Sequence, residues 1–177
     1  SVRRGIYALA CCLMLAAALW GLRTTMAMRN ISGAATQLAL ARPDLAARDV
    51  AAAKLWAPAS MPHIPRYEAR WRTEKLRLEE NSLGTEEKRR LYYEAISFLN
   101  ETLRRQPSLA YVYSDRAKLH YLAQRQKIGD DGAEKAIADL EAALRADPIN
   151  LDARMGLANI YLQDGAMKKA ESVLGAG

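Results

Sequence analysis

Apolar residues follow two different patterns along this chain. From Gly5 to Leu22 they form an unbroken, uncharged stretch of eighteen residues. Beyond it, apolar and charged residues are mixed, and Pro and Gly divide the chain into segments of helical length. The first pattern predicts one helix that is apolar on all sides. The second predicts a set of shorter helices that pack on one another.

The apolar stretch has the length and the flanks of a membrane-spanning helix. At a rise of about 1.5 Å per residue it reaches about 27 Å, close to the hydrocarbon thickness of a bilayer. Arg3 and Arg4 precede it and Arg23 follows it. Aromatic rings prefer the membrane interface, and one lies near each end. We expect residues 5–22 to contact the lipid bilayer, with these residues marking the two ends of the anchor: Gly5, Tyr7, Trp20 and Leu22.

A cleaved signal peptide is the main alternative to a permanent anchor. Its apolar region is usually shorter, and the nearest small-residue cleavage site, Thr25-Met26-Ala27, is a poor one. A lipoprotein site at Cys11 is rejected, because it needs Leu three residues upstream and Ala8 stands there. We therefore predict a single-pass protein of a bacterial inner membrane. The flanking arginines nearly balance; a short basic tail usually stays in the cytoplasm, which favours a periplasmic soluble part over a cytosolic one.

Proline positions divide the chain beyond the anchor. No Pro interrupts residues 1–42, so the anchor helix is expected to continue off the membrane. Asp44 is the expected N-cap of a helix that ends at Trp56, and His63 is expected in a surface loop of an extended connector. The predicted division has three parts: an anchor with its extension, 1–42; an incomplete helical repeat and Pro-rich connector, 43–64; and helical repeats, 65–177.

An internal repeat organises the C-terminal part. Residues recur at offsets of 41 and then 34 positions, as Ala95, Ala136 and Ala170; as Leu99, Leu140 and Leu174; and as Pro107 and Pro148. One period of 34 residues, with a seven-residue insertion at Arg125 to Gly132, accounts for both offsets. Helices are expected over 65–80 and 85–105, and two further pairs begin near Ala110 and at Leu151. We expect the insertion to project from the stacked helices as a loop.

The last repeat resembles the tetratricopeptide repeat family at these positions: Leu157, Ala158, Tyr161, Gly165, Ala170 and Leu174, with Pro148 closing the previous repeat. In this pattern Ala158 and Ala170 let two helices approach, and Tyr161 and Leu174 fill the space between them. Gly165 permits a tight turn. The resemblance implies an all-α fold: a single N-terminal transmembrane helix followed by an α-solenoid of helix pairs, whose concave face binds a protein partner.

Charge and composition exclude several other classes. The net charge is +6, but basic and acidic residues are interleaved from Arg66 to Arg90, which is unlike a nucleic-acid-binding surface. The two Cys are adjacent and the two His are far apart, so neither a disulfide framework nor a metal site is expected. No phosphate-binding loop or nucleophile elbow is present. We expect no catalytic residues, cofactor or metal, and therefore no enzyme; His120 is expected to pack between helices.

The helix-pair pattern also predicts which residues face the groove. These are Tyr111, Ser114, Lys118 and Tyr121 in the middle repeat, and Asp152, Met155, Asn159 and Gln163 in the last. This mixture suits an extended or helical protein segment, and ordinary solvated surface is the alternative. The leading hypothesis is a membrane-anchored scaffold that positions protein partners, other membrane proteins of one complex. The alternative is an accessory subunit of an envelope polysaccharide polymerase or ligase.

Overall fold

The computed structural model describes residues 2–58, 61, 63–129 and 131–175, with side chains from Cys11 onwards. The regular structure of these residues is entirely helical, as the sequence predicts. The helices are α1 (Val2–Ala39), α2 (Pro43–Trp56), α3 (His63–Leu78), α4 (Thr85–Arg105), α5 (Ala110–Arg125), α6 (Gly132–Ala146), α7 (Leu151–Gln163) and α8 (Met167–Gly175).

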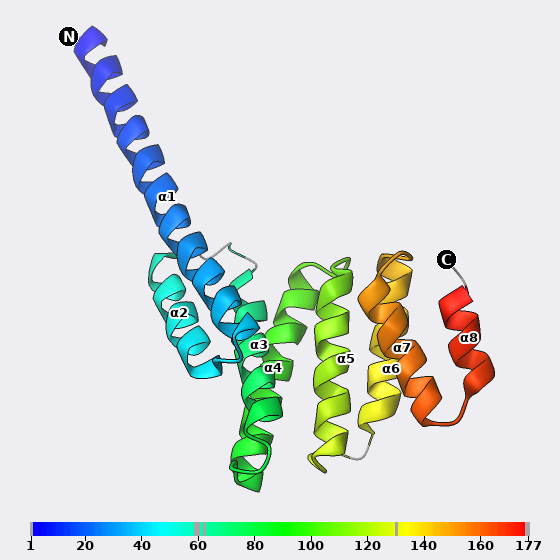
Figure 1. Cartoon of the computed structure of the whole chain (residues 1–177). Helices are drawn as coiled ribbons and strands as arrows, with labels where there is room; N and C mark the ends of the chain where they lie inside the picture. Colours follow the sequence, from blue (N-terminus) through cyan, green and yellow to red (C-terminus); the bar gives the residue numbers. More distant parts are fainter. Residues whose placement is uncertain (1, 59–60, 62, 130, 176–177) are drawn as a thin grey trace.

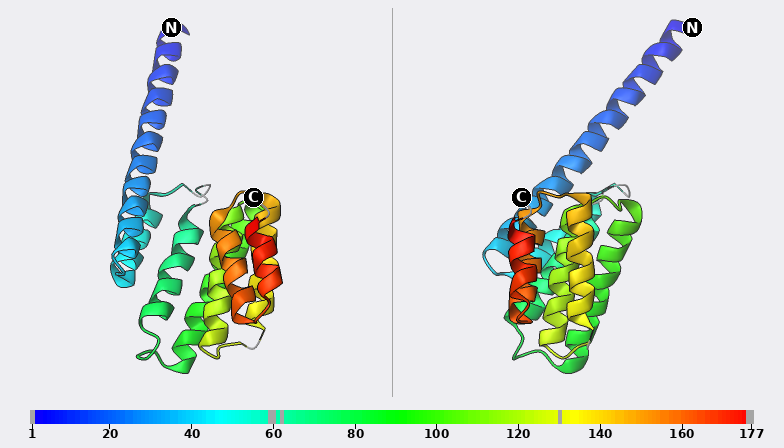
Figure 2. Two further views of the ribbon diagram at one scale, coloured as in Figure 1. Left: turned by 45° about the vertical axis from the view of Figure 1, so that its right-hand side comes forward. Right: turned by 90° about the vertical axis from the view of Figure 1, so that its right-hand side faces the viewer.

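The helices stack side by side in sequence order, and α1 projects far beyond the stack (Figure 1). Successive helices pair as α1–α2, α3–α4, α5–α6 and α7–α8, and each pair leans on the next. The first helices of neighbouring pairs also contact one another, α1 with α3, α3 with α5 and α5 with α7. The views in Figure 2 show the stack turning gradually while α1 stays apart from all of it except at its base. This is the predicted solenoid of helix pairs.

Two local predictions at the start of the stack are wrong. Asp44 is not the N-cap of α2; Arg42 holds that position and Pro43 begins the helix, where its missing N–H costs nothing. The Asp44 carboxylate instead pairs with Lys75 of α3 at 2.9 Å. His63 does not lie in a loop but begins α3. Pro65 does not prevent this start, because the N–H groups in the first turn of a helix have no partner within the helix.

The first pair is built like the later ones. Ala46, Val50, Ala53 and Pro58 of the α2 segment repeat the spacing of Ala95, Leu99, Thr102 and Pro107 and of Ala136, Leu140, Ala143 and Pro148. Every member of these sets except the prolines is buried. The partner of α2 is the C-terminal part of α1, whose buried face consists of Ala27, Ile31, Ala34 and Leu38. The segment expected to be half a repeat therefore has its first helix, supplied by the continuation of the apolar helix.

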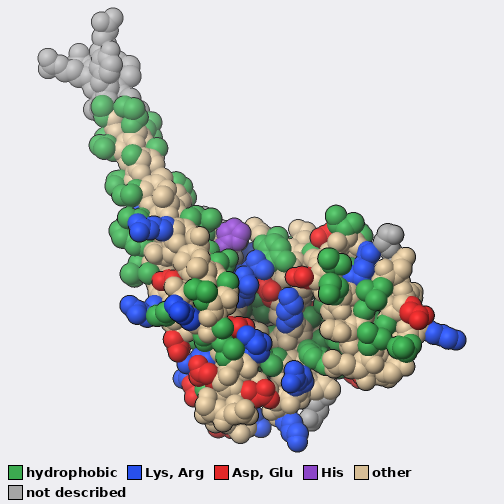
Figure 3. Space-filling view, in the orientation of Figure 1, with side chains coloured by type: hydrophobic (Ala, Val, Ile, Leu, Met, Phe, Trp, Pro, Cys, Tyr) green, Lys and Arg blue, Asp and Glu red, His purple; other side chains and the backbone are tan. Residues whose placement is uncertain are grey.

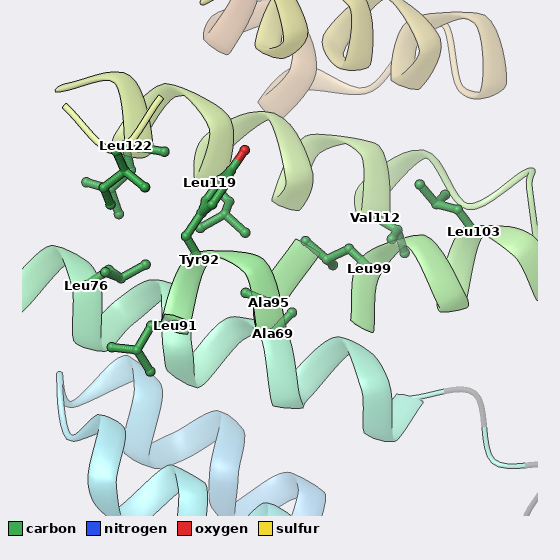
Figure 4. Packing of buried hydrophobic residues seen from close by; sticks show 12 residues of the cluster. Ala69, Leu76, Leu91, Tyr92, Ala95, Leu99, Leu103, Val112, Leu119 and Leu122 are labelled. Atoms are coloured by element: carbon green, nitrogen blue, oxygen red, sulfur yellow. The ribbon is translucent and has the colours of Figure 1, made fainter. Parts of the chain in front are cut away.

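Small residues on one helix and large ones on the next form the core between pairs. In the largest cluster, Ala69 of α3 and Ala95 of α4 let those helices approach, and Leu99 and Leu119 fill the space toward α5 (Figure 4). Leu76, Leu99 and Leu119 are fully buried. A second cluster joins α5, α6 and α7, and the third joins α1, α2 and α3. The core is therefore a chain of neighbour contacts, as expected for a solenoid.

The predicted insertion begins and ends at helix boundaries but does not project freely. Ile128, in the turn between α5 and α6, is only 8% exposed and belongs to the largest core cluster. The Gln126 side-chain amide donates to the Leu76 carbonyl of α3 at 2.7 Å. The turn makes these two contacts because it lies against the preceding helix pair, α3–α4. The expectation of a loop outside the stacked core is wrong for these two residues.

The last pair differs from its predicted packing at one position. Gly165 adopts a positive φ of 73° in the turn, as expected, and Ala170 is buried. Leu174, expected to fill the space between α7 and α8, is 52% exposed. Val173, one residue earlier, packs against the cluster instead. The last turn of α8 therefore presents Leu174 outward.

Candidate functional site

A cavity of about 230 Å³ lies between α5 and α7, on the face of the stack made by the first helices of the pairs. Figure 3 shows this face. The floor of the cavity is apolar and its rim is polar. The lining residues are Ala117, Leu140, Gly156 and Ile160, with Lys118, Tyr121, Asp152, Asn159 and Gln163. We call this cavity the α5–α7 groove.

Two polar pairs cross the α5–α7 groove. Lys118 of α5 lies 3.6 Å from Asp152 of α7, and both side chains are exposed. The hydroxyl of Tyr121 donates to the side-chain oxygen of Gln163. Exposed pairs of this kind contribute little to stability, about 0–1 kcal/mol. An incoming chain can therefore replace them with its own polar contacts at small cost.

A second cavity, of about 210 Å³, continues the same face between α3 and α5. It is more polar and shares Lys118 with the α5–α7 groove. Its lining residues are Ala69, Arg70, Thr73, Glu74, Leu99, Asp115 and Lys118. Arg66 fixes one side of this region, because its Nε donates to Asp115 at 2.7 Å and its guanidinium stacks 4.1 Å from the Tyr111 ring. The two cavities together form a surface that a linear chain segment can follow.

The structure places the eight predicted groove residues in different settings. Five of them line the α5–α7 groove: Lys118, Tyr121, Asp152, Asn159 and Gln163. Tyr111 lies half-buried under Arg66, and Ser114 is buried, with its hydroxyl directed to the Ala110 carbonyl. Met155 is 56% exposed on α7 and is not among the lining residues.

Sequence reasoning did not identify the floor of the groove. Leu140 belongs to α6, and it reaches the groove because Gly156 of α7 leaves room for it. A Cβ at Gly156 would lie 3.2 Å from Leu140 Cδ2. The only signal in the sequence is a Gly inside a helical segment, which often marks a close approach of two elements. Which element approaches is a property of the fold.

Behind the groove, His120 of α5 is buried in a polar cluster. Its Nδ1 lies 2.9 Å from the Tyr92 hydroxyl of α4, and its Nε2 lies 3.7 Å from Asp139 of α6. Asp139 in turn accepts two hydrogen bonds from Arg116, from Nε at 2.8 Å and from Nη2 at 2.5 Å. Burial lowers the pKa of His120, and burial raises the pKa of Tyr92. His120 therefore joins three helices in its neutral form, which fits the expected packing role.

The groove offers hydrogen bonds and apolar contacts rather than reactive groups. Within the described residues, no three side chains of the metal-binding types come together. The lining side chains are a lysine, an aspartate, two amides, a phenol and aliphatic groups. Side chains of these kinds can exchange hydrogen bonds with polar groups and contact apolar ones.

The projecting part of α1 is apolar and exposed. Residues 11–23 are exposed, and the charged side chains in Figure 3 lie on the body of the molecule and at the base of α1. A segment of 29 residues, Cys11–Ala39, is long and apolar enough to cross a membrane, and 6% of its apolar window is buried. Trp20 and Leu22 are 56% and 51% exposed. The predicted anchor residues Gly5 and Tyr7 lie outside the residues whose side chains are described.

Comparison with known proteins supports the repeat assignment. The family model of the tetratricopeptide repeat matches residues 130–177, which contain α6, α7 and α8. This chain carries a tetratricopeptide repeat. No curated protein and no solved structure matches the chain. Tetratricopeptide repeats are typically non-catalytic and mediate contacts between proteins, so the repeat points to a protein–protein interaction scaffold.

Proposed function

We propose that this protein is a non-catalytic scaffold that is anchored in a membrane by α1 and binds a protein partner of the same membrane complex in the α5–α7 groove. One observation carries the proposal. A long apolar helix is exposed over residues 11–23 and then continues, without a break, into the first helix pair of the stack.

The exposure of this segment supports a membrane environment. The core helix of a soluble protein would bury most of its apolar side chains, whereas Leu13, Leu15 and Leu19 are each more than 60% exposed. Leaving large aliphatic side chains in water costs about 1.5–3 kcal/mol each relative to burial. Lipid removes that cost.

The continuity of α1 supports a permanent anchor over a cleaved signal peptide. The nearest candidate cleavage site ends at Ala27, and Ala27 is fully buried. Cleavage there would separate the buried face of α1, which packs in the first helix pair, from the exposed apolar part of the same helix. We propose the division at residues 1–42, 43–64 and 65–177 as one of sequence character, with α1 shared between the anchor and the first pair.

The groove supports a partner with an extended or helical segment. Asn159 and Gln163 are one turn apart on α7 and offer amide groups to a peptide backbone, and Ile160 and Leu140 offer an apolar floor. Anchoring in the membrane raises the local concentration of other membrane proteins, so modest contacts are sufficient. We further propose the bacterial inner membrane, with the repeats on the periplasmic side; a reporter enzyme fused after α8 that is active only in one compartment tests this orientation.

Co-purification from mild detergent tests the scaffold proposal. The full chain should retain a partner that is lost or reduced in the double variant Asn159→Ala and Gln163→Ala. The double variant Glu134→Ala and Glu141→Ala, which changes two exposed residues of α6 outside the groove lining, serves as the control. Recovery of equal amounts of partner with the two double variants would contradict binding in the α5–α7 groove. Release of the full chain from membranes by carbonate would contradict the anchor.

A further inference from the structure

The last turn of α2 ends beside the point where the exposed apolar part of α1 begins. Arg23 is the first charged residue after the apolar stretch, and its Nε donates to the Trp56 carbonyl at 3.4 Å. Toward the body from this contact, α1 has a buried face that starts at Ala27. Toward the N-terminus, residues 11–23 are exposed. The end of α2 therefore lies at the level where the proposed anchor leaves the body.

Two large apolar side chains are exposed at this level. Leu55 is 78% exposed and Trp56 is 40% exposed. Neither belongs to the core cluster of the first pair, whose α2 members are Ala46, Val50 and Ala53. The neighbouring Lys54 is engaged with Glu68 of α3 at 2.8 Å. The outward side of this turn is therefore apolar and adjoins the exposed apolar surface of α1.

The repeat itself shows that this surface is unusual. Leu55 stands nine residues after Ala46, and the same position in the next two pairs is held by Arg104 and Arg145. Both arginines are exposed and pair with a glutamate of the preceding turn, Arg104 with Glu101 at 2.9 Å and Arg145 with Glu141 at 4.0 Å. In α2 the residues of that preceding turn are Ala51 and Ala52. Among α2, α4 and α6, the exposed Arg at this position is thus replaced by Leu in the helix that packs on the anchor helix.

We propose that the last turn of α2 inserts into the interface of the phospholipid bilayer, with Leu55 and Trp56 among the upper acyl chains and Arg23 at the level of the phosphates. Trp favours this region because its ring is apolar and its N–H is polar, and Arg reaches from apolar surroundings to phosphate. The proposal rests on the proposed membrane anchor. A second contact beside α1 would limit rotation of the stack about the helix axis, so the α5–α7 groove would keep a fixed direction relative to the membrane.

Site-directed spin labelling of the full chain tests this insertion. Cys11→Ala and Cys12→Ala remove the native thiols, and single cysteines are then introduced as Leu15→Cys, Leu55→Cys and Arg104→Cys. All three positions are exposed, so the labels do not disturb the core. The protein is placed in vesicles of phosphatidylcholine and phosphatidylglycerol. Collisions of each label are measured with oxygen, which concentrates in hydrocarbon, and with a water-soluble nickel chelate.

The label at Leu55 should show an oxygen-to-nickel collision ratio severalfold higher than the label at Arg104, its counterpart in the next pair, and lower than the label at Leu15. Equal ratios at Leu55 and Arg104 would place the end of α2 in water and overturn the inference. Protection of Leu55 from both reagents would show that a protein covers it, which also overturns the inference. If the Leu15 label itself is in water, the anchor proposal fails, and that result is distinct from a failure at Leu55 alone.

Discussion

The polar side chains at the centre of the stack work as one connected group. Asp139 is buried, and its charge is balanced by the two hydrogen bonds from Arg116, which stacks 5.6 Å from the Tyr113 ring. Arg116 also donates to Asn100 of α4 at 2.6 Å. These hydrogen bonds are directional, so they fix how α4, α5 and α6 are oriented, in addition to the apolar packing between these helices. A buried charge of this kind is tolerated because its partners are held in place by the helices around it.

Asp139→Ala should therefore destabilise the fold strongly. The change leaves the half-buried Arg116 without its carboxylate, and the expected loss is about 3 kcal/mol of unfolding free energy. Urea unfolding of the detergent-solubilised full chain, followed by circular dichroism, measures it. The matched control is Asp152→Ala, which removes an exposed carboxylate from Lys118 and should cost less than about 1 kcal/mol. Similar losses in both variants would show that burial does not distinguish the two ion pairs.

His120 should make stability depend on pH between neutral and mildly acidic conditions. Its folded pKa is lowered from the usual 6.5, mainly by burial, although the Asp139 carboxylate opposes this effect. The nearby groups are Tyr92 of α4, Arg116 of α5, Lys135 and Asp139 of α6, and Asp131 of the turn. As the pH falls, the unfolded chain binds a proton on His120 before the folded chain does. The contribution of His120 to the unfolding free energy is therefore complete above the unfolded pKa, and it is lost as the pH falls from there through the folded pKa.

The measurement is the unfolding free energy of the full chain and of His120→Asn at several pH values. The native chain should lose stability as the pH falls below about 6.5, with a slope of at most about 1.4 kcal/mol per pH unit for one proton. The variant should be less stable at neutral pH but flatter in this range. The lowered pKa of Glu68 acts only at lower pH, because its usual value is 4.5. An unchanged slope in the variant would contradict the assignment to His120.

At the scale of helices and turns, more of the insertion between α5 and α6 extends these two helices than extends the turn between them. Relative to the last pair, three of the seven extra residues extend α5, three extend the turn and one extends α6. The longer pair brings the turn level with α3, where Ile128 and Gln126 make their contacts. Gly132 begins α6 at a close approach, since a Cβ there would lie 2.4 Å from the His120 carbonyl oxygen.

Ile128→Ala should cost about 2–4 kcal/mol, because it removes a buried aliphatic side chain from the largest cluster. Lys127→Ala is the control; Lys127 is exposed in the same turn, and its replacement should change the unfolding free energy by less than about 0.5 kcal/mol. Thermal unfolding of the two variants compares them directly. A negligible effect of Ile128→Ala would restore the expectation of a loop that lies outside the core.

The sequence predicted those elements whose signals are local. The bounds of α4 match the helix expected over 85–105, the start of α7 follows Pro148, and the turn lies at Gly165 as expected from its positive φ. Packing between elements was harder to predict. The burial of Ile128, the floor of the groove at Leu140 and the exposure of Leu174 depend on which helix lies opposite, and periodicity within one helix does not contain that information.

The first helix pair was missed in sequence because its two helices have different compositions. The α2 half keeps the spacing of the later pairs, with Ala46, Val50, Ala53 and Pro58. The α1 half lies within a longer apolar helix, so its buried face at Ala27, Ile31, Ala34 and Leu38 does not stand out against polar neighbours. Only the packing of α2 on that face shows where the anchor helix becomes part of the stack.

At the scale of the whole molecule, α1 has two roles that meet near Thr24. Over residues 11–22 its side chains are exposed and apolar; after Thr24, one face is buried against α2 and reaches toward Ile64 of α3. A soluble form of the protein should therefore begin at Thr24; a start near Asp44 also omits the apolar stretch of residues 5–22, but it divides the first helix pair. The chain from Thr24 loses the exposed apolar segment and keeps the core of the first pair.

The two shortened chains give opposite expectations. The chain from Thr24 should be soluble without detergent, monomeric in size-exclusion chromatography and fully helical.

The chain from Asp44 lacks Ile31 and Leu38, and burial of two such side chains contributes about 3–6 kcal/mol. This is a large part of the 5–15 kcal/mol by which domains are typically stable, and it leaves Val50 and Ala53 of α2 uncovered. That chain should aggregate or melt well below the longer one. Because each kcal/mol shifts the midpoint of a chain of this size by about 2–4 °C, a difference of roughly ten degrees is expected. Equal unfolding midpoints and equal solubility of the two chains would mean that α1 serves as a membrane anchor but does not stabilise the stack, which would then begin at α2.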